Sequence, residues 1–192
     1  MKKLFNQLKI NNYFITIFDS IILIFISSYF SYFKFKDFFT SGGSKVIGDN
    51  GDPRFILFLL EHIYQSLNNN IFNLASPPIF YPYKWTLTFS DWLIFPGFFH
   101  SFFRIIGLDL FESFEFSMIL SNALFFIFLY IAINSITKLN KIFSIFISVL
   151  ISYGYFLDYH IYWLQNFSIF LIPLFFYFLI SKDINILDLR KL

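Results

Sequence analysis

Long apolar runs dominate this sequence of 192 residues and limit what it can fold into. A helix that crosses a hydrocarbon layer of about 30 Å needs about 20 apolar residues. Four runs approach or reach that length, at about 13–33, 114–134, 142–158 and 162–181. With 57% hydrophobic and 14% charged residues, the chain has more apolar surface than one soluble core could hide. We therefore expect an all-α membrane protein with about four transmembrane helices in a single membrane domain.

A fifth apolar stretch, about 91–107, is shorter than the other four. It has Pro96 and Gly97 in its middle, and it carries His100 and Arg104. These features favour a re-entrant or interfacial helix over one that crosses the membrane.

Basic residues set the expected orientation, because Lys and Arg beside short loops stay on the cytoplasmic side. The sequence has three basic clusters: Lys2, Lys3 and Lys9; Lys138 and Lys141; and Lys182, Arg190 and Lys191. If the segment 91–107 does not cross the membrane, all three clusters lie on the cytoplasmic side. If it does cross, the cluster of Lys138 and Lys141 lies outside. We expect a multi-pass protein with a cytoplasmic N-terminus and one long extracytoplasmic loop, about 34–113.

The expected outer loop holds most of the polar and turn-forming residues, so function is sought there. After a flexible Ser41–Ser44 stretch, a helix is predicted over about 53–68, with Asp52 as its N-cap and Pro53 in its first position. It is predicted to be amphipathic, to lie along the membrane surface and to end at Asn68–Asn70. Its apolar stripe is Ile56, Leu59, Leu60, Ile63 and Leu67, and its polar residues are Arg54, Glu61, His62 and Gln65.

The segment after this helix is rich in proline, from Ser76 to Lys84. Proline restricts both itself and the residue before it, so an extended and rigid path is predicted. A second surface helix is then expected over 91–107, starting at Ser90-Asp91.

Two carboxylates in a Gly-rich turn, Asp49 and Asp52, are the leading candidates for chemistry. Three residues apart, they could hold a divalent cation such as Mg²⁺ or Mn²⁺, or one of them could act as a general base. In the alternative interpretation, Asp52 only caps its helix and Asp49 stabilises the turn. No other cofactor is expected.

A second polar cluster, Asp158 and His160, lies between the third and fourth apolar runs. The expected topology puts it on the same outer face as Asp49 and Asp52. His160 could pair with a phosphate or donate a proton, or it could be an interfacial residue in the surrounding aromatic belt.

Other polar residues of the outer loop are candidates for substrate binding. Glu61 and His62 could line a groove above the surface helix, although solvated positions on that helix explain them equally well. The cations Lys84, Arg104 and His100 could engage a phosphate or pyrophosphate, and snorkelling to lipid head groups is the alternative for Arg104.

Composition excludes several classes of function. The absence of cysteine excludes disulfides, thiolate metal sites and a Cys nucleophile. The net charge of +2 and the scattered basic residues do not suggest nucleic acid as a partner. The lipid bilayer is an expected partner, and the sequence does not indicate an oligomeric state.

The order of several short motifs resembles bacterial GT-C-type integral membrane glycosyltransferases. The resemblance covers about residues 10–181. The motifs are Gly51-Asp52-Pro53, Leu60-Glu61-His62, Pro78-Ile79-Phe80-Tyr81-Pro82, Ser90-Asp91, and Ile106-Gly107-Leu108 before a long membrane helix.

The resemblance implies a GT-C-like N-terminal module in a bacterial inner membrane. The implied reaction moves a sugar from a polyprenyl-phosphate donor to a lipid, glycan or protein acceptor at the extracytoplasmic face. On that likeness, Asp52 is the catalytic carboxylate and Asp49 its helper, while Asp158 and His160 lie near the donor. Tyr81, with Lys84, Glu61 and His62, is expected to contact substrate.

The chain departs from that family because it has about four crossings, and family members usually have many more. We therefore expect a piece of a longer protein. A rival interpretation is a non-catalytic membrane subunit or lipid-carrier-binding protein of envelope polysaccharide assembly. A transporter fragment would need polar residues that face each other at mid-membrane, and the sequence mostly lacks them.

Overall fold

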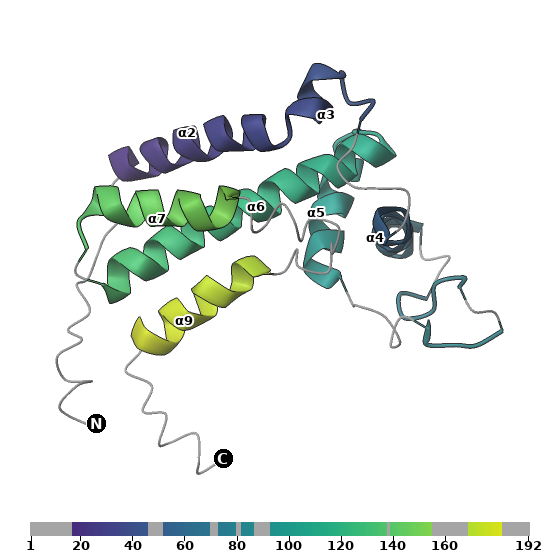
Figure 1. The fold of residues 1–192 in the computed structure, drawn as a ribbon. Helices are drawn as coiled ribbons and strands as arrows, with labels where there is room; N and C mark the ends of the chain where they lie inside the picture. Colours follow the sequence, from purple (N-terminus) through teal and green to yellow (C-terminus); the bar gives the residue numbers. More distant parts are fainter. Residues whose placement is uncertain are drawn as a thin grey trace, which may run out of the picture.

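The computed structural model describes residues 17–45, 52–69, 73–79, 82–86, 93–137, 139–154 and 169–181. These ranges contain seven α-helices and no strand, which confirms the all-α fold class (Figure 1). The helices are α2 (Ile17–Lys34), α3 (Lys36–Thr40), α4 (Asp52–Asn69), α5 (Ile94–Ile105), α6 (Leu110–Ile136), α7 (Lys141–Tyr153) and α9 (Leu171–Ser181).

The predicted apolar runs agree with these helices to different extents. Among the described residues, one helix is long and apolar enough to cross a membrane, namely the 27-residue α6 over the expected run 114–134. Helix α7 is apolar but has 13 residues. Residues 155–158 of its expected run and the first part of the run 162–181 lie outside the described residues.

Helix α6 is the central element of the fold. Its start is fixed by a capping box, in which the Asp109 side chain accepts from the Glu112 backbone nitrogen at 2.8 Å and Glu112 accepts from the Asp109 nitrogen at 3.1 Å. Helices α2, α7 and α9 pack along α6, and α4 and α5 pack near its N-terminal end (Figure 1). The fold is thus a bundle with a two-helix unit at one end.

Two clusters of buried side chains follow this division. The cluster at the α4–α5 end joins α4 to the first turns of α6 and to the end of α2, and it consists of Phe35, Ile56, Leu59, Leu60, Leu93, Phe114 and Met118. The second cluster lies farther along α6 and consists of Leu23, Phe126 and Tyr130. Burial of these apolar groups fixes α4 against α6.

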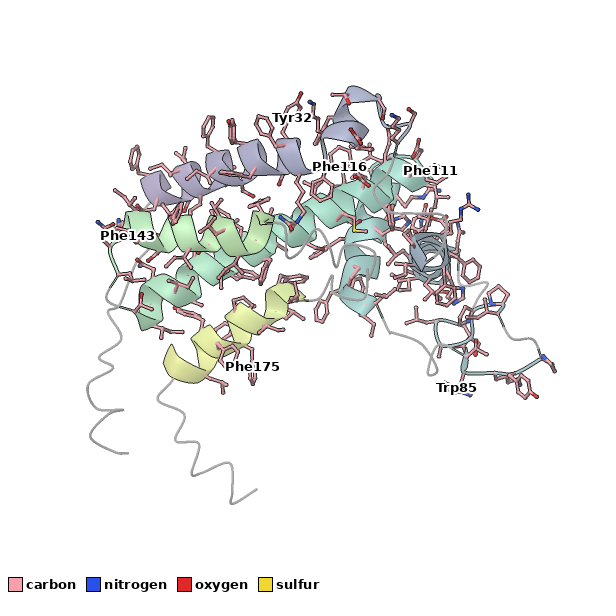
Figure 2. All side chains as sticks on the ribbon, in the orientation of Figure 1. Tyr32, Trp85, Phe111, Phe116, Phe143 and Phe175 are labelled. Atoms are coloured by element: carbon pink, nitrogen blue, oxygen red, sulfur yellow. The ribbon has the colours of Figure 1, made fainter. Side chains whose placement is uncertain are left out.

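The bundle buries small polar residues and exposes large apolar ones. In α7 the buried residues are all serines: Ser144, Ser148 and Ser152. The outward face of the same helix carries Ile142 and Phe143, which are 73% and 60% exposed. Small residues at a helix interface let two backbones approach closely. Exposed rings such as Tyr32, Phe143 and Phe175 lie on the outside of the bundle (Figure 2).

An ion pair joins the starts of α2 and α7. Lys141 Nζ lies 3.0 Å from Asp19 Oδ1 and 3.1 Å from Oδ2. The pair keeps the Asp19 carboxylate, which lies in the first apolar run, from being buried without a partner. It also means that α2 and α7 begin at the same end of the bundle, opposite the α4–α5 unit (Figure 1).

Two loop segments differ from the sequence-based expectations. The stretch expected to be flexible forms a tight turn after α3, where Gly42 and Gly43 have φ of 62° and 83° and the Gly43 nitrogen donates to Phe38 O at 3.0 Å. The proline-rich segment does not run straight. Thr86 Oγ1 donates to Pro77 O at 3.1 Å, so the chain turns back on itself between these residues.

Candidate functional site

Helix α4 carries the polar residues that the sequence singled out. It begins at Asp52, one position before the predicted start, and it ends at Asn69 as expected. The structure does not describe the Asp52 side chain. Asp49, Tyr81, Asp158 and His160 lie outside the described residues, so the predicted pocket between the two acidic clusters stays a prediction.

The predicted apolar stripe of α4 is largely confirmed. Ile56, Leu59, Leu60 and Ile63 are buried, with exposures of 1–3%, because they face α5 and α6. Leu67 is 47% exposed and lies outside this interface. Lys84 is exposed in the loop that follows the helix.

His62 had two interpretations, a groove-lining residue or a solvated one, and the second is wrong because its side chain is only 5% exposed. Its Nε2 lies 3.2 Å from the Asn73 carbonyl oxygen and 3.3 Å from the Leu74 carbonyl oxygen. Both carbonyls belong to the segment after α4. His62 therefore attaches that segment to the helix, a role that sequence spacing alone could not indicate.

Glu61 forms the centre of a hydrogen-bond network between α4 and α5. His100 Nε2 lies 3.1 Å from Glu61 Oε2, and Arg104 Nε donates to the same oxygen at 3.2 Å. Gln65 Nε2 donates to Glu61 Oε1 at 2.8 Å. The Glu61 carboxylate thus accepts from three side chains, two of which lie on the neighbouring helix.

Arg104 extends this network beyond Glu61. One of its terminal nitrogens donates to the Leu108 carbonyl oxygen at 2.9 Å, just before α6 begins. Its guanidinium carbon lies 5.1 Å from the centre of the Tyr64 ring, a cation–π distance. Arg104 therefore connects α4, α5 and the start of α6, and lipid snorkelling is not needed to explain it.

His100 is fully buried in this network. Burial lowers the pKa of its imidazole from the usual 6.5, although the hydrogen bond and charge of Glu61 act in the opposite direction. In a neutral ring the proton must be on Nε2, since the Glu61 carboxylate can only accept. The nearby Ser113 backbone also acts to raise the pKa of His100, but less than Glu61 does. No described atom makes a hydrogen bond with His100 Nδ1.

The geometry of the network indicates a supporting role. Both Glu61 oxygens already accept hydrogen bonds, and the Arg104 guanidinium is engaged on several sides. A ligand would have to displace these internal partners. The network holds α4 and α5 in one orientation, and it thereby fixes the helix that begins at Asp52.

A further buried carboxylate, Glu115, was not found by sequence analysis. It lies in the second turn of α6, and only 1% of its surface is exposed. It has an interaction partner, as a buried carboxylate requires. The signal available in the sequence was a charged residue inside a long apolar run, where such residues commonly have a function.

The described residues contain no group of three or more His, Cys, Asp or Glu side chains that could hold a metal ion. The predicted cation ligands are not among them, because Asp49 and the Asp52 side chain are not described. Comparison with protein-family models, with curated proteins and with solved structures found no match.

Proposed function

We propose that the chain crosses a membrane four times and is the membrane-embedded module of a glycosyltransferase. The proposed reaction transfers a sugar from a polyprenyl-phosphate donor to a lipid, glycan or protein acceptor on the extracytoplasmic side. The membrane part of the proposal is supported by the apolar outer faces of α2, α7 and α9 and by the buried serines of α7.

One observation carries the enzymatic part of the proposal. The helix that begins at Asp52 packs on α5 and on the N-terminal turns of α6, at the end of the bundle opposite the Asp19–Lys141 pair. With Lys141 on the cytoplasmic side, the α4–α5 unit is extracytoplasmic. This is the arrangement implied by the resemblance to GT-C enzymes, in which a first outer loop carries an acidic residue and surface helices.

The roles proposed for the site residues follow from that arrangement. Asp52 would act as general base on the acceptor hydroxyl, with Asp49 holding a divalent cation or a hydrogen bond beside it. Asp158, His160, Tyr81 and Lys84 would contact the donor. Glu61, with His100 and Arg104, would position α4 rather than touch the sugar.

The test is an Asp52→Asn substitution in the full-length protein, with sugar transfer measured in membrane vesicles from a labelled polyprenyl-phosphate donor. Loss of the base should lower the turnover number at least about 100-fold. Membrane insertion should not change, because Asn has nearly the same shape and is also accepted at a helix start.

Asp109→Asn is the matched control, since this residue also lies at a helix start near the α4–α5 unit and has no proposed role in catalysis. It should transfer sugar at nearly the normal rate. Normal turnover in the Asp52→Asn protein would remove the central assignment.

One feature favours a second candidate, a non-catalytic subunit that binds the lipid carrier. A groove of about 450 Å³ lies between α6 and α9, and its walls are apolar except for Thr137. Such a groove suits a hydrocarbon or isoprenoid chain. Saturable binding of labelled polyprenyl phosphate without any sugar transfer by the full-length protein would favour this candidate.

A further inference from the structure

A lysine side chain lies where α2, α6 and α7 meet. Lys34, in the last turn of α2, donates from Nζ to Asn122 Oδ1 at 3.2 Å, and its Nζ lies 3.5 Å from the Ser152 carbonyl oxygen. Asn122 is near the middle of α6. A charged group held between apolar helices is costly and commonly has a function.

Two polar groups beside Lys34 are buried and make no hydrogen bond to any described atom, namely Asn122 Nδ2 and Ser152 Oγ. The ammonium of Lys34 can only donate, so the Asn122 oxygen must face it and the amide NH₂ group is left unused. Unmade hydrogen bonds of buried groups are rare in folded proteins and call for an explanation.

Ser152 breaks the pattern of its own helix. The hydroxyls of Ser144 and Ser148 each donate to the carbonyl four residues earlier, at 3.3 Å and 2.7 Å. The Ser152 hydroxyl makes no such bond, although its side chain is fully buried. Its donor is therefore not used by any described atom.

Helix capping by Lys34 does not account for these groups. The Ser152 carbonyl lies in the last turn of α7, where a cation is stabilising, and Lys34 Nζ already meets that need. Capping uses neither the Asn122 amide nor the Ser152 hydroxyl. What these two groups share with the ammonium is the ability to donate a hydrogen bond to an oxygen.

We propose that Lys34, Asn122 and Ser152 form a binding site for a phosphate group. The ammonium supplies the positive charge, while the Asn122 amide and the Ser152 hydroxyl donate hydrogen bonds to phosphate oxygens. Lys34 and Asn122 are partly exposed, so a ligand that approaches from the bundle surface meets Lys34 first, and the buried Asn122 amide and Ser152 hydroxyl must turn toward it. The phosphate can belong to a lipid head group or be a free ion.

This site is separate from the α4 residues assigned to sugar transfer, and the proposal stands whether or not the chain is a transferase. The test therefore measures binding. The full chain is purified in micelles of a neutral alkyl glycoside, and its thermal unfolding is followed at increasing concentrations of dodecyl phosphate or inorganic phosphate. A ligand of the folded state raises the midpoint temperature.

Three variants test the assignment of residues. Asn122→Asp keeps the oxygen that accepts from Lys34 but replaces the free amide by a repelling charge, so phosphate affinity should fall at least about tenfold. Ser152→Ala should weaken binding about tenfold through loss of a donor to a charged acceptor. Ser148→Ala is the matched control, because that hydroxyl is already bonded to Ser144 O, and it should bind phosphate normally.

Stabilisation by dodecyl phosphate alone would identify a lipid head group as the ligand, and stabilisation by inorganic phosphate as well would identify a free anion. The proposal is wrong if neither compound raises the midpoint temperature of the unmodified chain. It is also wrong if the rise is as large in the folded Asn122→Asp protein.

Discussion

Gly97 in α5 lies directly against Ile63 in α4. A Cβ atom built on Gly97 would lie 2.6 Å from Ile63 Cδ1 and 2.9 Å from Cγ2, closer than carbon atoms approach each other in folded proteins. This contact brings the two helices close enough for Glu61 on α4 to accept from His100 and Arg104 on α5.

We predict that Gly97→Ala destabilises the fold, even though alanine is the better helix former. The added methyl group must push Ile63 or the whole of α4 away, which costs about 1–3 kcal/mol of unfolding free energy. Denaturant titration of the purified chain in detergent micelles measures this cost.

Combining Gly97→Ala with Ile63→Ala separates crowding from other effects. Ile63→Ala alone removes buried contacts and should cost about 2–5 kcal/mol. In the double variant the new methyl group occupies part of the vacated space, so the total loss should be smaller than the sum of the single losses. Additive losses would mean that the two side chains do not compete for space.

A second prediction concerns the Glu61 network. Glu61→Gln keeps the size of the side chain but removes its charge and turns one acceptor into a donor that faces other donors. Hydrogen bonds to charged groups contribute about 1.5–3 kcal/mol, so the unfolding free energy should fall by about 2 kcal/mol. Denaturant titration in micelles again provides the measurement.

Glu112→Gln is the control for this change of charge. Glu112 completes the capping box of α6, and glutamine can serve there in the same way. The control should lose well under about 1 kcal/mol. Equal losses in both variants would show that the network contributes no more than an exposed cap.

The network also predicts how stability depends on pH. Burial holds the pKa of His100 below its usual 6.5, so between that folded value and 6.5 the unfolded chain binds more protons than the folded one. The contribution of His100 to the free energy of unfolding is therefore fully present above pH 6.5 and is lost as the pH falls below that value. The slope from this residue can reach about 1.4 kcal/mol per pH unit.

His100→Gln tests this pH dependence, because the glutamine amide can still donate to Glu61 and does not titrate. The unfolding free energy is measured at several pH values from about 5.5 to about 7.5, which lie on both sides of the usual His pKa. It should change less with pH in this variant than in the unmodified protein. His62→Gln should keep the slope that His100 causes. Identical slopes in the unmodified and His100→Gln proteins would contradict a buried neutral His100.

Local sequence signals predicted a good part of this fold. The long apolar run predicted α6, and the polar triplet Asn68–Asn70 predicted the end of α4, since both signals act within one or two helical turns. The buried face of α4 followed from its 3.6-residue period. The fold class needed no information about contacts between helices.

The contacts between helices could not be predicted in this way. Glu61 and His100 were both noted as polar, but nothing local indicates that residues 39 positions apart in sequence would pair. The cluster of Lys34, Asn122 and Ser152 was not predicted, because a few serines change the mean hydropathy of a long apolar run very little. The contacts of Lys34 with Asn122 and with the Ser152 carbonyl were likewise not predicted.

A last prediction tests the proposed crossing of the membrane. The natural chain has no cysteine, so single cysteines introduced by Lys45→Cys and Leu139→Cys can be labelled one at a time. Both positions are exposed, and they lie near opposite ends of the bundle: Lys45 follows α3, and Leu139 precedes the start of α7 at Lys141.

A membrane-impermeant maleimide applied to intact cells should label the Lys45→Cys protein and should label the Leu139→Cys protein only after permeabilisation. The reason is that the basic residues beside Leu139 favour the cytoplasmic side, and α2 must then carry Lys45 to the other face. Lys84→Cys, in the exposed loop after α4, should behave like Lys45→Cys because no crossing is proposed between the two positions. Labelling of both ends from one side would mean that α6 does not cross, and the apolar outer surface around it would then have to be covered by protein rather than by lipid.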